Sequence, residues 1–353
     1  MAGEQDLKQR VSSQSNIPLD QVIFDGTTKT FELPKAHGKG IQITMSGKFK
    51  IVCSGVPAVK AGGVIANLIE TIEVKDSRGL LKDMRIVDMQ DSTERLTGDR
   101  SPLIYTKATT DIGLNATATL NATDLPVPTI TVDNWYSFVE SVHLPFECDI
   151  AQANFLDTLL QYNGRDINTL KMVSNKIESL FVGGAGIVIS GVDIKVDFNY
   201  ITMANSGLGR RWRQWQAERQ FSASVTKARM ELNAVDSLAG LKIEVTKGAA
   251  RNKITVDEAK LIKFDLSVRK NGVESYLHSD ESLLLLNLQD TSKKSLYKIN
   301  PSRGYMNMIT GNLIESAEQN TYSEMNLLVT LPTAMPFDIN NPYNVRLLVD
   351  EIE

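Results

Sequence analysis

The chain has 353 residues, of which 42% are hydrophobic and 23% are charged, and these are ordinary proportions for a globular protein. They exclude a disordered, collagenous or low-complexity chain, and the length suits two domains of ordinary size. The 38 Lys and Arg residues against 42 Asp and Glu residues give a net charge of −4, so no global positive field draws the chain to nucleic acid or to an acidic bilayer. We therefore expect no specific nucleic-acid partner.

Residues that carry catalytic or metal chemistry are scarce. The chain has two cysteines and three histidines, and they lack the close spacing that zinc sites use. It has no Gly-x-Ser-x-Gly segment, no His-Glu-x-x-His pair and no complete phosphate-binding fingerprint. We therefore expect no metal, no cofactor and no enzymatic activity. The polar N-terminus lacks the apolar run of a signal peptide, which indicates synthesis in the cytoplasm.

The first 26 residues are predicted to form an N-terminal arm outside the core. They combine a short polar helix from about Gln5 to Ser13 with a serine-rich stretch and Pro18. Two interpretations remain open for this arm: a frayed terminus, or a contact with a neighbouring molecule or a membrane.

From residue 27 onwards the dominant pattern is an alternation of apolar and polar residues, which is typical of half-buried strands. The apolar members of the first run are Ile41, Ile43, Met45, Phe49 and Ile51. Further runs lie at residues 194–200, 241–245, 262–268, 325–331 and 345–349. Asn271 and Gly272 provide a hairpin signal between two of these regions, and residues 76–79 provide a turn.

Alternation favours antiparallel sheets with one solvated face over a doubly wound parallel sheet. Few internal helices are expected: a short one after Asp149, in which Phe155, Leu156, Leu159 and Leu160 share a face, and one from about Arg210 to Phe221. The fold class is therefore all-β, with two tandem eight-stranded antiparallel sandwiches. The predicted divisions are an arm at 1–26, a first sandwich at 27–204, a linker at 205–220 and a second sandwich at 221–353.

The linker contains an unusual basic and aromatic cluster of four arginines and two tryptophans within about three helical turns. On a helix, its two tryptophans would share one face. Tryptophan favours interfaces between apolar and wet surroundings, and arginine binds phosphate, so the cluster is a candidate contact for lipid headgroups or a partner. In the alternative, the rings pack on a sandwich and the arginines pair with acidic neighbours or another subunit. The cluster consists of Arg210, Arg211, Trp212, Arg213, Trp215 and Arg219.

Several segments, in matching order, resemble a known family. Residues 31–48, running on to Ile51, are similar to the first strand of double jelly-roll major capsid proteins of tailless, internal-membrane-containing bacteriophages, the lineage shared with adenovirus hexon. Residues 66–79 resemble the paired strands that follow, and residues 142–146 with 155–160 resemble the mid-domain strand and helix. Residues 322–331 and 344–352 resemble, more weakly, the last strands of the second jelly roll.

This resemblance implies that each sandwich is a jelly roll and that three chains form a pseudo-hexagonal capsomer. It further implies that such homotrimers tile an icosahedral virion capsid over an internal membrane, after synthesis in the host cytoplasm. The expected partners are neighbouring capsid trimers, penton proteins, minor membrane proteins and lipid headgroups. Two alternatives remain: a carbohydrate-binding or glycan-cleaving β-sandwich module of a phage fibre, and a β-rich assembly scaffold.

Overall fold

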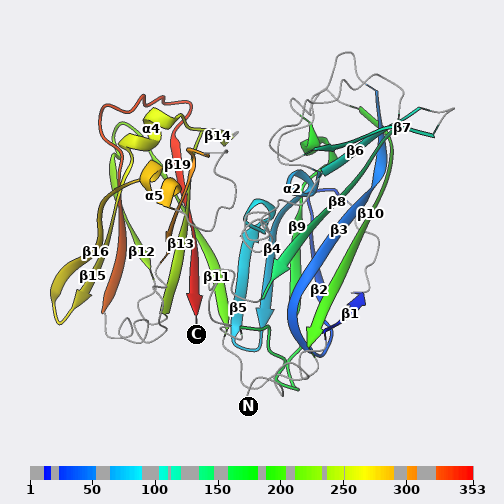
Figure 1. Cartoon of the computed structure of the whole chain (residues 1–353), viewed down its shortest axis with the longest axis horizontal. Helices are drawn as coiled ribbons and strands as arrows, with labels where there is room; N and C mark the ends of the chain where they lie inside the picture. The colour runs from blue at the N-terminus through cyan, green and yellow to red at the C-terminus, as the bar shows by residue number, and fades with distance from the viewer. Residues whose placement is uncertain are drawn as a thin grey trace. The chain divides into compact units, whose positions relative to one another are not determined.

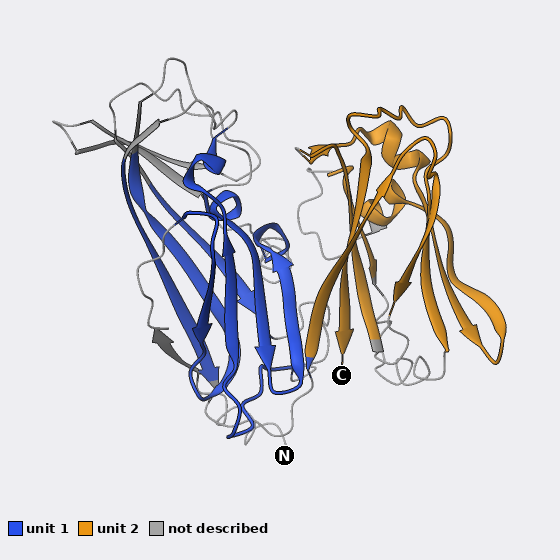
Figure 2. Cartoon of the chain, turned by 180° about the vertical axis from the view of Figure 1, so that it is seen from behind, with its two compact units in different colours: residues 1–149, 156–211 blue, residues 150–155, 212–353 orange. Residues whose placement is uncertain are grey.

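A computed structural model shows a chain of antiparallel sheets that divides into two compact units (Figures 1 and 2). Unit 1 comprises Met1–Asp149 and Leu156–Arg211, and unit 2 comprises Ile150–Phe155 and Trp212–Glu353. The structure describes residues 12–16, 24–52, 64–89, 103–109, 113–120, 135–146, 158–181, 188–203, 211–232, 237–249, 251–289, 300–307 and 323–352.

Unit 1 contains strands from two sheets, and every described pairing within it is antiparallel. The first sheet has, in spatial order, β1 (Ser12–Asn16), β10 (Val188–Met203), β3 (His37–Val52), β8 (Trp135–Pro145), β6 (Leu103–Thr109) and β7 (Gly113–Leu120). The second group has, in spatial order, β5 (Gly79–Arg85), β4 (Ile69–Asp76), β9 (Thr169–Ser174) and β2 (Thr28–Glu32). Unit 1 also contains two short helices, α2 (Val64–Leu68) and η1 (Ile177–Leu180), and residues 86–89 are helical as well.

The core of unit 1 forms where the period-two pattern predicted it. Ile41, Ile43 and Met45 of β3 are fully buried, and Phe198 and Tyr200 of the neighbouring β10 are buried with them. These side chains lie on one face because successive residues of a strand point to opposite faces. The predicted strand at residues 41–51 is therefore confirmed.

The described part of the N-terminal arm is an edge strand of this sheet. In β1, Ser12 lies opposite Met203 and Asn16 lies opposite Asn199 of β10. The predicted helix from Gln5 to Ser13 is wrong for Ser12 and Ser13, because pairing with β10 satisfies their backbone groups, and its other residues lie outside the described residues.

A buried carboxylate joins β8 to helix α2. Oε2 of Glu140 accepts a hydrogen bond from the backbone N–H of Ile65 at 2.8 Å, and the Glu140 side chain is almost completely buried. Burial raises the pKa of Glu140 to about 7, although hydrogen bonds from the backbone of Ile65 and Val64 act in the opposite direction. The folded chain therefore holds a proton on this carboxyl at pH values where an unfolded chain would release it.

Glu140→Gln is expected to remove one component of the pH dependence of stability. Because the pKa of Glu140 is higher in the folded state, about 7 against 4.5, the folded state binds more protons between these values and loses stability as the pH rises through them. Urea unfolding of both proteins from pH 4.5 to pH 8 measures the effect. The free energy of unfolding of the Glu140→Gln variant should fall less steeply with rising pH than that of the parent. Glu70→Gln, at an exposed position, is the control, and its free energy of unfolding should depend on pH as that of the parent does. Parallel curves for the parent and Glu140→Gln would show that Glu140 does not contribute to the pH dependence.

Unit 2 also contains two groups of antiparallel strands. The first has, in spatial order, β14 (Asn252–Lys253), β13 (Ser237–Lys247), β19 (Tyr343–Ile352) and β11 (Trp212–Phe221), with β17 (Arg303–Asn307) also pairing with β13. The second is a four-stranded sheet in the order β12 (Lys227–Leu232), β18 (Glu324–Thr330), β15 (Lys263–Lys270) and β16 (Val273–Ser282). Helices α4 (Val256–Leu261) and α5 (Leu283–Gln289) lie at one end of the unit (Figure 1).

The core of unit 2 again follows the predicted alternation. Phe264, Leu266 and Val268 of β15 are buried together with alternate residues of β13, β18 and β19. The hairpin signal is confirmed, since Asn271 and Gly272 join β15 to β16 with φ values of 52° and 79°. Positive φ at both central residues is typical of the type I′ turn, which matches the twist of the flanking strands.

Both internal helices that the sequence predicted are corrected where the structure describes them. Residues 212–221 form strand β11, which pairs along its whole length with β19, from Trp212 opposite Ile352 to Phe221 opposite Tyr343. Residues 212–220, assigned to a linker from the sequence, are therefore part of a sheet. After Asp149, the described residues 158–160 are not helical, and Leu160 forms a bridge with Gly38. In both places pairing with a distant strand outweighs local helix propensity.

Candidate functional site

The basic and aromatic cluster lies on β11 and on the residue before it, with Arg210 outside the described residues. On a strand, positions 212 and 215 point to opposite faces, so the two tryptophans do not share the single face that a helix would give them. Trp215 packs against the hydrophobic core of unit 2, whereas Trp212 belongs to the other face of the sheet. The expected common tryptophan surface is therefore wrong.

Arg211 makes a buried ion pair with Asp76, the last residue of β4. Its Nε donates to Oδ2 at 2.8 Å and its Nη2 donates to Oδ1 at 2.9 Å, so the guanidinium binds both carboxylate oxygens in a bidentate arrangement. Only 3% of the Arg211 side chain and 2% of the Asp76 side chain are exposed. The same Asp76 also accepts a hydrogen bond from the backbone N–H of Arg78, at 2.9 Å, in the turn before β5. The pair fixes the last residue of unit 1 to a turn of the same unit.

Trp212 is 1% exposed, so its ring is not available to a membrane in this chain. The Nζ atom of Lys242, on β13, lies 5.7 Å from the centroid of that ring, a geometry typical of cation–π contacts. The next two residues contact side chains of β19. Arg213 Nη1 lies 3.3 Å from Glu351 Oε2, and Gln214 Nε2 donates to Asp350 Oδ1 at 2.5 Å.

Among the described members of the cluster, Arg219 is the exposed one. Its Nη1 donates to the backbone carbonyl of Arg229 on β12, at 3.1 Å. For Arg211, Trp212, Arg213 and Trp215, the observed burial and contacts favour the alternative in which the rings pack on the sandwich and the arginines pair with acidic neighbours.

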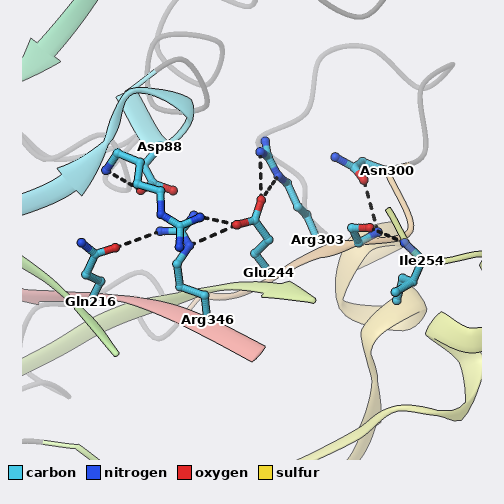
Figure 3. Close-up of polar contacts among 9 residues, drawn as sticks. Asp88, Gln216, Glu244, Ile254, Asn300, Arg303 and Arg346 are labelled. Atoms are coloured by element: carbon cyan, nitrogen blue, oxygen red, sulfur yellow. Dashed lines mark hydrogen bonds and ion pairs between the residues drawn. The ribbon is translucent and has the colours of Figure 1, made fainter. Parts of the chain in front are cut away.

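A second polar cluster, which sequence reasoning missed, joins four strands of unit 2 (Figure 3). Glu244 of β13 accepts from Arg346 of β19 at 3.0 and 3.1 Å through Oε2, and from Arg303 of β17 at 3.2 and 3.3 Å through Oε1. Arg346 also donates to Gln216 of β11 at 3.5 Å. Glu244 lies directly opposite both arginines in the strand register, so only the pairing of strands far apart in the sequence could have revealed the cluster.

The described residues offer little for catalysis or for metal binding. Two of the three histidines contact different neighbours: His37 Nδ1 accepts a hydrogen bond from the backbone N–H of Tyr162 at 3.3 Å, and His278 Nδ1 lies 3.9 Å from Glu281 Oε1. Burial, with the charge of Lys39 second, lowers the pKa of His143. Within the described ranges, no three His, Cys, Asp or Glu side chains gather into a metal-binding group. Cys53 and Cys148 lie outside them.

No helix in the described parts of the chain combines the length and the apolar character needed to cross a bilayer. The regular structure of these residues is dominated by strands, and the helices are short.

No protein-family model and no curated protein sequence matches the chain. The structure is similar to the MCP of STIV, the Sulfolobus Turreted Icosahedral Virus, with a TM-score of 0.60 over 97% of this chain and 96% of that chain at 10% identity. It is also similar to the PBCV-1 virus capsid, with a TM-score of 0.54 over 97% of this chain and 94% of that chain at 11% identity. The major capsid protein P2 of bacteriophage PM2 gives a TM-score of 0.52 over 97% of both chains at 10% identity. The likeness covers both units, and the chain has the double jelly-roll fold, as the sequence predicted.

Proposed function

We propose that the chain is a non-enzymatic major capsid protein that assembles as a homotrimer and tiles an icosahedral shell. The observation that carries the proposal is the extent of the structural similarity: 94–97% of each of three viral capsid proteins is covered, and 97% of this chain. A fold alone can serve unrelated functions. Here, however, the similarity extends to both jelly rolls in tandem and to nearly the full length of each protein.

Two similar units in one chain suit a six-sided building block made from three copies. A cyclic trimer presents each unit three times, so six sandwiches form its rim, and such a tile can pack on a nearly hexagonal lattice. An obligate assembly of this kind buries roughly 2,000 Å² or more at each subunit interface. The partners in this proposal are therefore neighbouring trimers, with penton proteins and minor membrane proteins where the lattice closes or meets lipid.

The resemblance of residues 31–51 and 66–79 to capsid proteins of membrane-containing phages supports the further proposal that the shell covers an internal membrane. The buried members of the basic and aromatic cluster then act within the chain. Arg211 holds the end of unit 1 and Trp212 begins the first strand of unit 2. The exposed Arg219 is the described member of the cluster that remains accessible to lipid headgroups or to another subunit.

The oligomeric state tests the proposal directly. Light scattering and native mass spectrometry of the purified chain should give three times the mass of one chain at low micromolar concentration, and negative-stain electron microscopy should show particles with six lobes. A stable monomer at that concentration would argue against the capsid role. Binding of an oligosaccharide array by a monomer would instead support a fibre module, and head-to-tail rings without six-lobed particles would support a scaffold.

A further inference from the structure

The chain enters strand β3 through a connection that starts at Leu33, and this connection is hydrogen-bonded to residues 160–168. The Leu33 N–H donates to the Asn168 carbonyl at 2.8 Å. Gly38 and Leu160 exchange two backbone hydrogen bonds, of 2.8 and 3.0 Å. Both ends of the 160–168 segment are therefore held by backbone groups, which do not titrate.

His37 adds a side-chain contact between these two ends. Nδ1 of its ring accepts a hydrogen bond from the backbone N–H of Tyr162 at 3.3 Å. A ring nitrogen accepts only while it carries no proton, so the neutral ring holds its proton on Nε2. Protonation turns Nδ1 into a second donor that faces the Tyr162 N–H, and the hydrogen bond is lost. Because the charge of histidine ordinarily changes between about pH 5 and 8, this contact is sensitive to acid.

A second histidine borders the same connection. His143 of β8 packs against Gly40, since a Cβ atom at position 40 would lie 2.5 Å from its Cε1 and 2.9 Å from its Nε2. Burial, with the charge of Lys39 second, lowers the pKa of His143. A histidine whose pKa is lower in the folded state favours the fold at high pH and loses this contribution as the pH falls. Acid therefore weakens the surroundings of His37 from this side as well.

The other ionisable groups around His37 give a new positive charge little compensation. Within the described residues, the groups on the segments that border it are Glu32, Lys35 and Lys39 before and after it, Tyr162, Arg165 and Asp166 on the 160–168 segment, His143 on β8 and Tyr200 on β10. The basic side chains outnumber the acidic ones. In addition, Asp166 Oδ2 accepts a hydrogen bond from Asn163 Nδ2 at 2.8 Å. Protonation of His37 therefore adds a charge to surroundings that are already positive.

We propose that His37 is a pH-sensitive latch, which holds the 160–168 segment against the entry to β3 when neutral and releases it when protonated. The released form lacks the hydrogen bond from Tyr162, whereas the backbone bonds at both ends of the segment remain. The exposed residues 163–167 then move while the sheets of unit 1 stay intact. The inference goes beyond the proposed function, because it concerns unit 1 alone and does not depend on how copies of the chain assemble.

Hydrogen–deuterium exchange of the full chain, measured by mass spectrometry, tests the latch. The protection of peptides that contain residues 160–163, corrected for the intrinsic effect of pH on exchange, should fall by roughly tenfold from about pH 7.5 to about pH 5. A peptide from residues 41–49 of β3 should keep its protection, which would show that the change is local. Global unfolding is a poorer measure, because Glu140 acts in the opposite direction over part of the same pH range.

Two substitutions at position 37 separate protonation from the loss of the side chain. His37→Asn places an amide oxygen close to the position of Nδ1, so it accepts from the Tyr162 N–H at every pH, and its protection at pH 5 should stay close to that at pH 7.5. His37→Ala has no acceptor and should give low protection at both pH values. His278→Asn removes a histidine from β16 and is the matched control, which should keep the pH dependence of the parent.

The parent alone can overturn the latch, so the test does not depend on the folding of any variant. Protection of residues 160–163 that is equal at pH 7.5 and pH 5 would do so. Far-UV circular dichroism at pH 7.5 shows which variants are folded. A folded His37→Asn variant that loses protection in acid as the parent does would also overturn the latch, and a loss that disappeared in His143→Gln instead would identify the buried histidine as the responsible group. Retained protection in His37→Asn, with the parent's loss in His278→Asn, supports the proposal.

Discussion

Replacing Arg211 with alanine is expected to lower the free energy of unfolding by about 3–5 kcal/mol, which is the usual cost of removing one member of a buried ion pair. The Asp76 carboxylate, with 2% of its side chain exposed, would stay buried and lose the guanidinium that holds both of its oxygens. Urea unfolding at neutral pH and a fixed chain concentration measures the change.

Two further variants separate the charge from the general effect of shortening an arginine. Arg269→Ala removes an exposed pair with Glu324, whose side chains are 37% and 46% exposed, and should cost less than about 1 kcal/mol. Combining Arg211→Met with Asp76→Asn removes both charges and keeps an acceptor for the backbone of Arg78, so it should recover part of the loss. An Arg211→Ala variant within 1 kcal/mol of the parent would show that the pair contributes little.

Gly47→Ala is expected to destabilise unit 1 by about 3 kcal/mol or more and to reduce the yield of folded protein. A Cβ atom at this position would lie 2.2 Å from the carbonyl oxygen of Asp193 and 2.7 Å from the Cα of Ile194, both in the backbone of β10. No side-chain rotation can relieve contacts with backbone atoms, so β3 and β10 would have to separate. A glycine inside a strand often marks such a close approach of another backbone.

Ser46→Ala, on the residue before it, is the matched control, because it tests whether β3 tolerates a small change at a half-buried position. This variant should unfold within about 0.5 kcal/mol of the parent, as most substitutions away from special features do. If Gly47→Ala unfolded at the same denaturant concentration as Ser46→Ala, β3 and β10 would accommodate a Cβ atom at position 47, and the close approach of their backbones would be wrong.

The strands that face solvent on one side could be predicted from the sequence, and β11 could not. In β3 and β15, apolar side chains occur at every second residue, so the period itself indicates a strand. In β11, Trp212 and Trp215 are three residues apart, which fits the spacing of a helix and not the period of two of a half-buried strand. Its backbone partner β19 comes near the end of the chain, and no local pattern reports that pairing.

The prediction of the candidate site from the sequence was limited for the same reason, because strand pairing between distant segments is not visible in a local pattern. The sequence identified the unusual concentration of arginine and tryptophan, but the environment of each side chain depends on strand register. Arg211 reaches Asp76 across 135 positions of the chain, and Arg346 reaches Glu244 across 102. The sequence therefore shows how many charged residues the chain has and where they lie along it. Which of them form buried ion pairs is decided by the tertiary fold. The exposure of Tyr276 likewise follows from the edge position of β16, which the hairpin signal alone does not determine.

The carboxyl of Glu140 gives unfolding a calorimetric signature. At about pH 6, between 4.5 and 7, that group is mostly protonated in the folded chain and mostly ionised in an unfolded one, so unfolding transfers close to one hydrogen ion to the buffer. The heat of the transition then includes the ionisation enthalpy of whichever buffer takes up the ion, and a scan in phosphate should differ from a scan in an amine buffer at the same pH.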